Sequence, residues 1–509
     1  MNRRQFLVSL GFGLFLESLN LNSELTKRIK ASPPKRKLPH IMIIMADDMG
    51  IGDLSCYNPD SLIPTPNMDR VAAEGLRFID AHSPAALCTP TRYSLLTGRY
   101  SWRTRLKRGV LMPYEPPLIE PSRLTLASLL RKREYGTYYI GKWHLGLKWT
   151  TKDGSKAGNF YTQGNPFQVD ENIQWRIDFT KPVEGGPTCL GFDYFFGTAG
   201  CSSSDPPYCF IENDELFQVP SRMSKEEWKG LPGFIPGPMA EDWSEEEIDV
   251  VFAQQAKKVI DTHLRKNRNR PLFLILSTNS PHVPWLVPDF IKGKSKEGPR
   301  GDLVVLVDWV VGEIDAHLKK RGIKEDTLLI VTSDNGARKG ANGHKSSLDF
   351  RGFKGDIWEG GHRVPFIVRW PGNVEPGGVS NELISLVDLL ATFAALISEP
   401  LPDNAGEDSW NILPAFFGNP EGKSLHEALV FQDRNGHLAI RQGKWKFIAP
   451  NEKMPQGELY DLENDRGEKF DLRAKYPEIA NKLKSLLYEY RQRGFSRPLK
   501  RKLPLPFFS

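Results

Sequence analysis

A cysteine stands two residues before a proline in the segment LCTPTRYSLLTGR, which spans residues 87–99. Proline is favoured in the first turn of a helix, because its missing N–H would have no partner there. The residues after Pro90 can continue as a short helix that ends at Gly98. Cys88 would then lie at a helix N-terminus, where unpaired N–H groups and the helix dipole suit a nucleophile or an anion. Arg92 would return to the same side one turn later.

The alternative for a lone cysteine is a buried core residue, so the rest of the chain has to decide. Polar residues that could do chemistry follow or end four segments predicted as strands, at 40–46, 137–140, 271–277 and 327–332. In an open α/β sheet, ligands bind at the carboxyl ends of the strands. The sequence therefore predicts a single site at this edge. The side chains concerned are Asp47, Asp48, Lys142, His144, His282, Asp334 and Asn335.

A hard metal ion fits the acidic members of this set, which offer only oxygen atoms. The sequence has no cysteine or histidine cluster at metal-binding spacing. Several carboxylate and amide oxygens in irregular geometry favour Ca²⁺ over Mg²⁺. Unrelated acidic turns are the alternative, but they would not explain why the aspartates follow buried strands. The candidate metal ligands are Asp47, Asp48, Asp334 and Asn335.

Helical segments alternate with these strands, which predicts an α/β domain with a buried sheet. The segment 148–243 is rich in glycine, proline, serine and aromatic residues. It is interpreted as insertions over the sheet edge, where substrate selection is common. The helices are expected at 66–76, 124–133, 245–266, 303–321 and 384–396.

A second, smaller subdomain is predicted after a turn-rich boundary near residue 400. Short strands at 427–432, 438–441 and 445–448, followed by a helix at 477–493, indicate an α+β unit with a short antiparallel sheet. The predicted organisation is a catalytic domain at 40–400, this subdomain at 401–496 and a tail at 497–509.

The composition is that of a large globular protein. The chain has 509 residues, is 39% hydrophobic and carries a formal net charge of +6, and no block of like charge is long enough to indicate a nucleic-acid-binding arm. Arg3 and Arg4 precede a short apolar run at 7–16, which resembles a twin-arginine export signal. We therefore expect an export signal at 1–31, a linker at 32–39 and a periplasmic or extracellular protein with no further transmembrane segment.

Five cysteines are present, and four would remain if Cys88 were modified. These four, which could form two disulfides, are Cys56, Cys189, Cys201 and Cys209. Cys201 and Cys209 flank a short loop and form the favoured pair, although the sequence leaves the pairing open.

The pattern Cys-x-Pro-x-Arg at Cys88, Pro90 and Arg92, followed by Leu-x-Thr-Gly-Arg, resembles the signature of the formylglycine-dependent (type I) sulfatases, a family of arylsulfatases and carbohydrate sulfatases. The resemblance implies an alkaline-phosphatase-like α/β/α sandwich with a large mixed sheet. It also implies that a formylglycine-generating enzyme oxidises Cys88 to formylglycine (3-oxoalanine), whose hydrated aldehyde is the nucleophile. Thr91 is more often serine in the family, but it lies outside the Cys/Pro/Arg core.

The same resemblance implies a role for each site residue. Ca²⁺ would be held by Asp47, Asp48, Asp334, Asn335 and the modified Cys88. Sulfate-binding and proton-handling roles would fall to Lys142, His144, His282 and Lys354. We expect a hydroxyl of the hydrated aldehyde to attack sulfur while Arg92 and the two lysines stabilise the charge. His282 would then protonate the leaving alcohol, and His144 would take the proton that lets the adduct collapse.

These inferences predict a sulfuric ester hydrolase that acts on a sulfated carbohydrate or an aryl sulfate. His344, near Lys354 in the sequence, is a further candidate substrate contact. Two alternatives stay open: a formylglycine-dependent phosphodiester or phosphonate ester hydrolase, and a sulfated-glycan binding protein if Cys88 is unmodified. Aromatic residues of the 148–243 segment could stack on sugar rings or simply pack against the core. They are Trp149, Phe160, Tyr161, Trp175, Phe192, Tyr194, Phe195 and Phe196.

Overall fold

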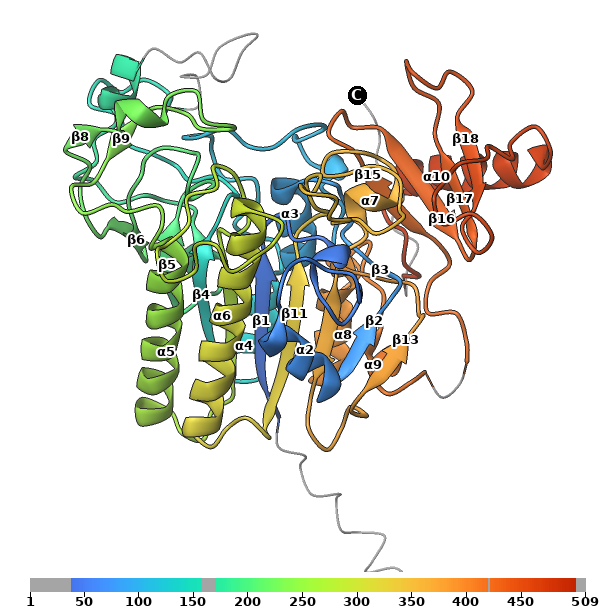
Figure 1. Cartoon of the computed structure of the whole chain (residues 1–509), viewed down its shortest axis with the longest axis horizontal. Coiled ribbons are helices and arrows are strands. Elements are labelled where there is room, and N and C mark those ends of the chain that lie inside the picture. Colours follow the sequence, from blue (N-terminus) through green and yellow to red (C-terminus); the bar gives the residue numbers. More distant parts are fainter. Residues whose placement is uncertain (1–37, 158–170, 420–421, 500–509) are drawn as a thin grey trace, which may run out of the picture. The chain divides into compact units, whose positions relative to one another are not determined.

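A ten-stranded mixed sheet is the centre of the fold (Figure 1). It is seen in a computed structural model that describes residues 38–157, 171–419 and 422–499. The four predicted strands are consecutive neighbours in it and pair in parallel, so their carboxyl ends lie at one edge of the sheet, as predicted. In sheet order they are β11 (Thr327–Ser333), β1 (His40–Ala46), β10 (Leu272–Ser277) and β4 (Gly136–Lys142).

The remaining strands extend this core on both sides, in the order β13-β2-β12 before β11 and β5-β6-β7 after β4. β5 pairs in parallel with β4, so the prediction that the 148–243 segment consists of insertions is wrong for this stretch. Its aromatic run suits a buried strand. The bounds are β2 (Leu76–Phe78), β12 (Phe366–Arg369), β13 (Gly378–Ser380), β5 (Tyr194–Thr198), β6 (Ile211–Glu212) and β7 (Glu215–Leu216).

Helices cover both faces of the sheet, which makes the predicted α/β/α sandwich (Figure 1). α2, α5 and α6 share a core with Met42 and Ile44 of β1 on one face. On the other face, Phe393 of α8 contacts Phe273 of β10, with ring centroids 6.3 Å apart. Strands covered on both faces need apolar side chains on both, which explains their near-continuous apolar runs. The helices are α2 (Pro66–Ala73), α3 (Cys88–Thr97), α4 (Leu126–Arg131), α5 (Ile248–Lys266), α6 (Pro299–Lys320), α7 (Glu359–His362), α8 (Leu389–Leu396) and α9 (Leu413–Phe416).

Two of the predicted helices are shortened because some of their residues belong to strands. The helix expected at 66–76 ends at Ala73, because Leu76 enters β2 and pairs with β12. The one expected at 384–396 begins only at Leu389, after a short strand that pairs with residues 81–82. Short elements complete the catalytic part: β3 (Ala81–His82), β14 (Ile384–Ser385), β8 (Arg222–Met223), β9 (Pro238–Met239), and the 3-10 helices η1 (Ile51–Asp53), η2 (Ser101–Arg103), η4 (Glu171–Arg176), η5 (Pro187–Leu190), η6 (Glu226–Trp228) and η7 (Leu386–Asp388).

The C-terminal part forms the predicted antiparallel sheet and final helix. Four strands pair in the order β15-β16-β17-β18, and the last of them was not predicted as a strand. The helix α10 (Pro477–Arg493) has the predicted bounds and shares a hydrophobic core with this sheet. The subdomain boundary near residue 400 stays a prediction. The strands are β15 (Leu429–Gln432), β16 (Leu438–Gln442), β17 (Trp445–Ile448) and β18 (Glu458–Asp461).

A buried charge network ties this small sheet to the catalytic part. Arg441 of β16 lies 2.6 Å from Asp80, and Lys446 of β17 lies 3.1 Å from Glu359 of α7. Arg363 contacts both Asp80 and Glu359. Removing one member of a buried charge pair costs about 3–5 kcal/mol, because its partner is left buried and unpaired. The network therefore fixes how the two sheets pack.

The chain divides after Pro39, and of the preceding unit the structure describes only residues 38 and 39. The predicted export signal at 1–31, most of the linker and residues 500–509 of the tail lie outside the described residues. Within the ranges described above, no helix is both long and apolar enough to cross a membrane.

Substituting Gly98 by alanine should destabilise the fold by about 2–4 kcal/mol. The new side chain would strain a backbone in the left-handed conformation and would also crowd its neighbours. Gly98 ends α3 with φ +63°, and a Cβ there would lie 2.8 Å from Ser409 Cβ and 2.9 Å from Gly406 Cα. Gly494→Ala is the matched control, since Gly494 ends α10 with φ +81° but no atom lies within 4 Å of its added Cβ. The control should lose only about 1 kcal/mol. Urea unfolding measures the free energy of unfolding of both variants. Equal losses of stability would contradict the role assigned to crowding at Gly98.

Candidate active site

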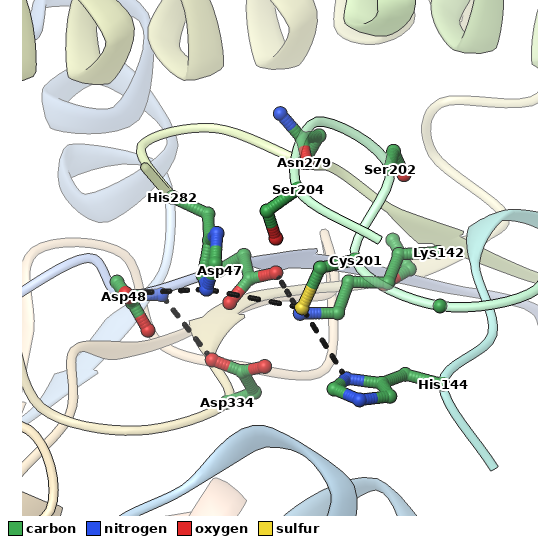
Figure 2. A network of polar contacts seen from close by, with 12 residues as sticks. Asp47, Asp48, Lys142, His144, Cys201, Ser202, Ser204, Asn279, His282 and Asp334 are labelled. Atoms are coloured by element: carbon green, nitrogen blue, oxygen red, sulfur yellow. Dashed lines mark hydrogen bonds and ion pairs between the residues drawn. The ribbon is translucent and has the colours of Figure 1, made fainter. Parts of the chain in front are cut away.

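The predicted site residues converge at the carboxyl edge of β11, β1, β10 and β4. Figure 2 shows how most of them point toward one another in a single polar network. Their side chains come from six places in the chain, and each of these residues is 9% exposed or less, so they act in a region of low dielectric constant. The residues brought together are Asp47, Asp48, Cys88, Arg92, Lys142, His144, His282, Asp334, Asn335 and Lys354.

Oxygen atoms form the acidic centre of this network. The backbone N–H of Asp48 donates to Asp334 Oδ1 over 3.3 Å, and Asn335 Nδ2 donates to Asp48 Oδ1 over 2.8 Å. Asp47 Oδ1 and Asn335 Oδ1 are buried and have no hydrogen-bond partner. A buried polar atom without a partner costs free energy, and a bound cation would satisfy both oxygens. These residues therefore fit an oxygen-liganded divalent metal ion.

Three buried cations balance the three buried carboxylates of the centre. Charges of this kind are tolerated away from water only when they are paired. When all six groups are charged their charges cancel, so a divalent cation added to the centre would make it net positive. The pairs are Lys142–Asp47, Lys354–Asp48 (2.6 Å) and Arg92–Asp334 (2.6 Å).

The surroundings push the pKa values of two of these carboxyl groups in opposite directions. Burial alone would raise the pKa of Asp48, but the positive charges of Lys354 and His282 outweigh it and hold this pKa below its usual value. Burial and the negative charge of Asp47 raise the pKa of Asp334 to about 7. A cation bound at Asp334 would therefore compete with a proton near neutral pH.

Cys88 is the first residue of α3 and is 2% exposed, and all ten residues of this helix are buried. A hydrogen bond with the thiol of Cys201 holds the pKa of Cys88 well below its usual range, and Lys142 and His144 add to this effect against that of burial. A thiol at a helix N-terminus among cations is readily ionised. The position expected from the sequence therefore suits a nucleophile in the structure as well.

The two histidines each turn one ring nitrogen toward the centre. His144 Nε2 donates to the carbonyl oxygen of Leu111 over 3.0 Å, which leaves Nδ1 as the acceptor of the neutral ring. His282 Nδ1 donates to the carbonyl oxygen of Val283 over 2.6 Å, which leaves Nε2 facing the centre, 4.0 Å from Asp48 Oδ2. Burial, with the positive charge of a nearby lysine, lowers the pKa of His282 to about 4.

Cys201 joins the two histidines and is a site residue that the sequence analysis missed (Figure 2). Its Sγ lies 3.5 Å from His144 Nδ1 and 3.8 Å from His282 Nε2. Burial raises the pKa of Cys201 well above its usual value, so it is a neutral thiol. Cys201 follows β5, and recognising residues 194–198 as a fifth parallel strand would have placed the loop after it at this edge.

The favoured disulfide between Cys201 and Cys209 is not formed, because all five cysteines are free thiols. Cys201 faces the two histidines of the site. Cys209 instead belongs to the hydrophobic core that includes Trp243 and Phe252. The pairing predicted from the short intervening loop is therefore wrong.

The Sulfatase family model matches residues 39–398, which is most of the chain. The chain belongs to the sulfatase family. It is a sulfuric ester hydrolase, as its signature at Cys88, Pro90 and Arg92 predicts. A second model, N-sulphoglucosamine sulphohydrolase, C-terminal, matches residues 353–493 of this sulfatase.

Characterised relatives align with nearly the whole of this sulfatase. N-acetylgalactosamine-6-O-sulfatase of Bacteroides thetaiotaomicron is 33% identical over 493 residues, covering 89% of this chain and 93% of its own. Human arylsulfatase A is 31% identical over 486 residues, covering 88% of this chain and 87% of its own. A solved structure reported for the metabolism of multiple glycosaminoglycans by B. thetaiotaomicron superposes with a TM-score of 0.78 at 31% identity, covering 90% of this chain and 100% of that one.

A cavity of about 670 Å³, here called the catalytic pocket, opens next to the centre of the sulfatase. Lys354 is part of the charged centre and also lines the pocket, as does Leu87, the residue before Cys88. Four cations and one carboxylate are among its lining residues, so it is basic. Its lining residues include Leu87, Gly109, Arg338, Lys339, Lys354, Arg434 and Asn435.

His344 does not join this site. Its Nε2 lies 2.9 Å from Asp53 Oδ1, and Arg300 contacts the same carboxylate over 2.7 Å. The side chain of His344 is fully buried in this separate charge cluster. The expectation that it contacts a substrate ring is therefore corrected: sequence distance to Lys354 was a poor guide, because the intervening loop turns His344 toward residue 53.

The aromatic residues of the 148–243 segment mostly pack against the core, which is the alternative stated above. Phe192 and Phe195 both contact Tyr139 of β4, and Phe196 stacks on Phe210. Trp149 packs edge-on against Tyr114. Phe160 and Tyr161 lie outside the described residues.

Replacing Cys201 by alanine should lower kcat about three- to tenfold, because it removes the one S–H hydrogen bond, worth about 0.5–1.5 kcal/mol, that Cys201 can donate to His144 or His282 and its contact with the other ring. Cys201→Ser keeps a small donor and should recover part of the loss. Steady-state hydrolysis of an aryl sulfate measures both. Cys209→Ala, a buried cysteine outside the site, is the control and should keep its kcat. Equal values for native, alanine and serine forms at position 201 would contradict the positioning role.

Proposed function

We propose that this sulfatase removes sulfate from a sulfated carbohydrate, with Cys88 converted to formylglycine and with Ca²⁺ as its metal ion. The observation that carries the proposal is the pair of buried, unpartnered oxygens of Asp47 and Asn335 in the network that includes Cys88. Bound Ca²⁺ would polarise sulfate oxygens, and hydrated formylglycine would offer one hydroxyl for attack on sulfur and another for release. The proposed Ca²⁺ ligands are Asp47, Asp48, Asp334, Asn335 and the modified Cys88.

The cations of the centre are the proposed sulfate-binding groups. Lys142 and Lys354 extend their ammonium groups to the carboxylates beside Cys88, and Arg92 reaches the same place from one turn along α3. Since three carboxylates and three cations already cancel, a divalent ion makes the centre attractive to an anion. The three cations would then stabilise the charge that develops on the sulfate oxygens.

His282 is the proposed donor of the proton to the leaving alcohol. The carbonyl oxygen of Val283 holds its Nδ1–H, so the transferred proton must be carried by Nε2. A sulfate anion beside the ring favours the imidazolium and raises the pKa of His282 from its low value, so substrate binding itself would charge the acid. His144 would accept a proton at Nδ1, because the carbonyl oxygen of Leu111 holds its Nε2–H.

The substrate proposal, a sulfated sugar, is supported by the catalytic pocket. Its volume of about 670 Å³ falls in the range of small-molecule sites and leaves room beyond the sulfate group. Its cations Arg338, Lys339 and Arg434 would favour a substrate that carries further negative charge. The likeness to an N-acetylgalactosamine-6-O-sulfatase supports the same class of substrate.

Maturation and location complete the proposal. A formylglycine-generating enzyme would convert Cys88. Export to the periplasm or the outside is supported by Arg3, Arg4 and the apolar run at 7–16.

Mass spectrometry of the peptide containing Cys88 tests the nucleophile. In protein produced together with a formylglycine-generating enzyme, we expect a mass about 18 Da below that of the thiol, from the exchange of a thiol for an aldehyde at the activated position. The converted protein should hydrolyse an aryl sulfate faster than an aryl phosphodiester. A Cys88 that stays a thiol while a control sulfatase is converted would refute this mechanism, and a faster phosphodiester reaction would favour the alternative substrate class.

Thermal unfolding with and without Ca²⁺ tests the metal ion. A ligand that binds only the folded state stabilises it, by about 2.7 kcal/mol at a hundredfold excess over Kd, so Ca²⁺ should raise Tm and a chelator should reverse the rise. Asp48→Asn should lose most of this shift, whereas Asp60→Asn, at an exposed position, should keep it. An equal shift with Mg²⁺ would contradict the preference for Ca²⁺, and an unchanged shift in Asp48→Asn would contradict the ligand set.

A further inference from the structure

A second basic pocket lies between η2 and the last turns of α10, outside the site described above. Its volume is about 670 Å³. None of the described residues that line it is acidic. We call it the distal basic pocket and define it by Arg99, Trp102, Arg103, Lys107, Tyr488 and Arg491.

The positive charge of this pocket is only partly neutralised. Arg99 pairs with Glu407 over 3.4 Å and Arg103 pairs with Asp408 over 2.8 Å. Those carboxylates are 12% and 0% exposed, so they neutralise the two arginines from behind the pocket wall.

Lys107 and Arg491 carry the unbalanced charge. Lys107 Nζ donates to the backbone carbonyl oxygen of Trp102 over 2.9 Å, and within the described part of the chain neither Lys107 nor Arg491 forms an ion pair. Partial burial, followed by the like charges of Arg99, Arg491 and Arg103, lowers the pKa of Lys107. Like charges held this close without a carboxylate between them favour the binding of an anion.

The distal basic pocket and the catalytic pocket share a wall. Lys107 lines the distal basic pocket, and Gly109, two residues later, lines the catalytic pocket. Likewise, Gly436 lines the distal basic pocket and its neighbour Asn435 lines the catalytic pocket. The two halves of this wall are in contact, since the N–H of Gly109 donates to the carbonyl oxygen of Arg434 over 2.9 Å. Two residues of chain span about 7 Å at most, so the two pockets are close neighbours.

We propose that the distal basic pocket binds a second anionic group, a sulfate or a carboxylate, of the same carbohydrate chain whose reacting sulfate ester lies in the catalytic pocket. The proposal rests on the proposed function for the identity of that chain. Arg338, Lys339 and Arg434 continue the positive charge from the reacting centre toward the shared wall. Tyr488, which is 63% exposed at the rim, offers an open aromatic face to a sugar ring.

This arrangement makes the enzyme select for chain length. A sulfated monosaccharide or an aryl sulfate fills the catalytic pocket alone and gains nothing from Lys107 or Arg491. An oligosaccharide with a further anionic group can reach both pockets, and the second contact adds to the first without a separate association event. The gain is electrostatic and must therefore weaken as salt rises.

The test uses the double variant Lys107→Gln/Arg491→Gln in the full chain. Kd is measured by calorimetry for a ladder of sulfated dextran oligosaccharides, from disaccharide to octasaccharide, and kcat/KM for an aryl sulfate. We expect Kd for the longest members to rise about 5- to 20-fold, while aryl sulfate hydrolysis is unchanged. The control Lys320→Gln/Lys482→Gln changes the net charge equally at exposed positions outside both pockets, and it should leave all values unchanged.

Each outcome decides a different point. Equal Kd values for native and variant protein across the ladder, or the same loss in the control, would overturn the distal site. A loss that is equal for the disaccharide and the octasaccharide would also overturn it, because length would then not matter. Length-dependent binding that is lost in the variant, in a protein that hydrolyses no sulfate ester, would keep the distal site and overturn the proposed function instead.

Discussion

Three carboxylates and three cations are held out of water at the carboxyl ends of the parallel strands, and the rest of the catalytic part is built around this pairing. Lys142 comes from the end of β4, Arg92 from α3 and Lys354 from the loop after β11. Because a buried charge without its partner costs about 3–5 kcal/mol, none of these elements can shift alone. The same pairing holds the site rigid and leaves two oxygens of the acidic centre available to a cation.

Elements were predicted correctly from the sequence where their structure depends on residues within the element itself. Strands buried on both faces need continuous apolar runs, so β1 was predicted with its observed bounds. The predicted bounds of α10 were confirmed, and the helix has Pro477 in its first turn and Gly494 just past its last one. The convergence of Asp47, His282 and Asp334 followed from one rule, that ligands gather where parallel strands end.

The errors share a physical origin in contacts between distant segments. β5 is a short aromatic stretch whose identity as a strand depends on its pairing with β4, and without it the loop carrying Cys201 had no predicted place. Cys201 meets histidines 57 and 81 residues away, which no spacing rule reveals. His344 was placed by its nearness to Lys354 in the sequence, whereas its actual partner, Asp53, is 291 residues away.

The burial of α3 limits when the proposed conversion of Cys88 could occur during folding. Cys88 is 2% exposed, and its helix is enclosed on all sides by the folded chain. If a second enzyme converts Cys88, as proposed, it could not reach the side chain in this position, so conversion would have to precede the burial of the helix. Under the same proposal, a chain that folded before conversion would be stable but inactive.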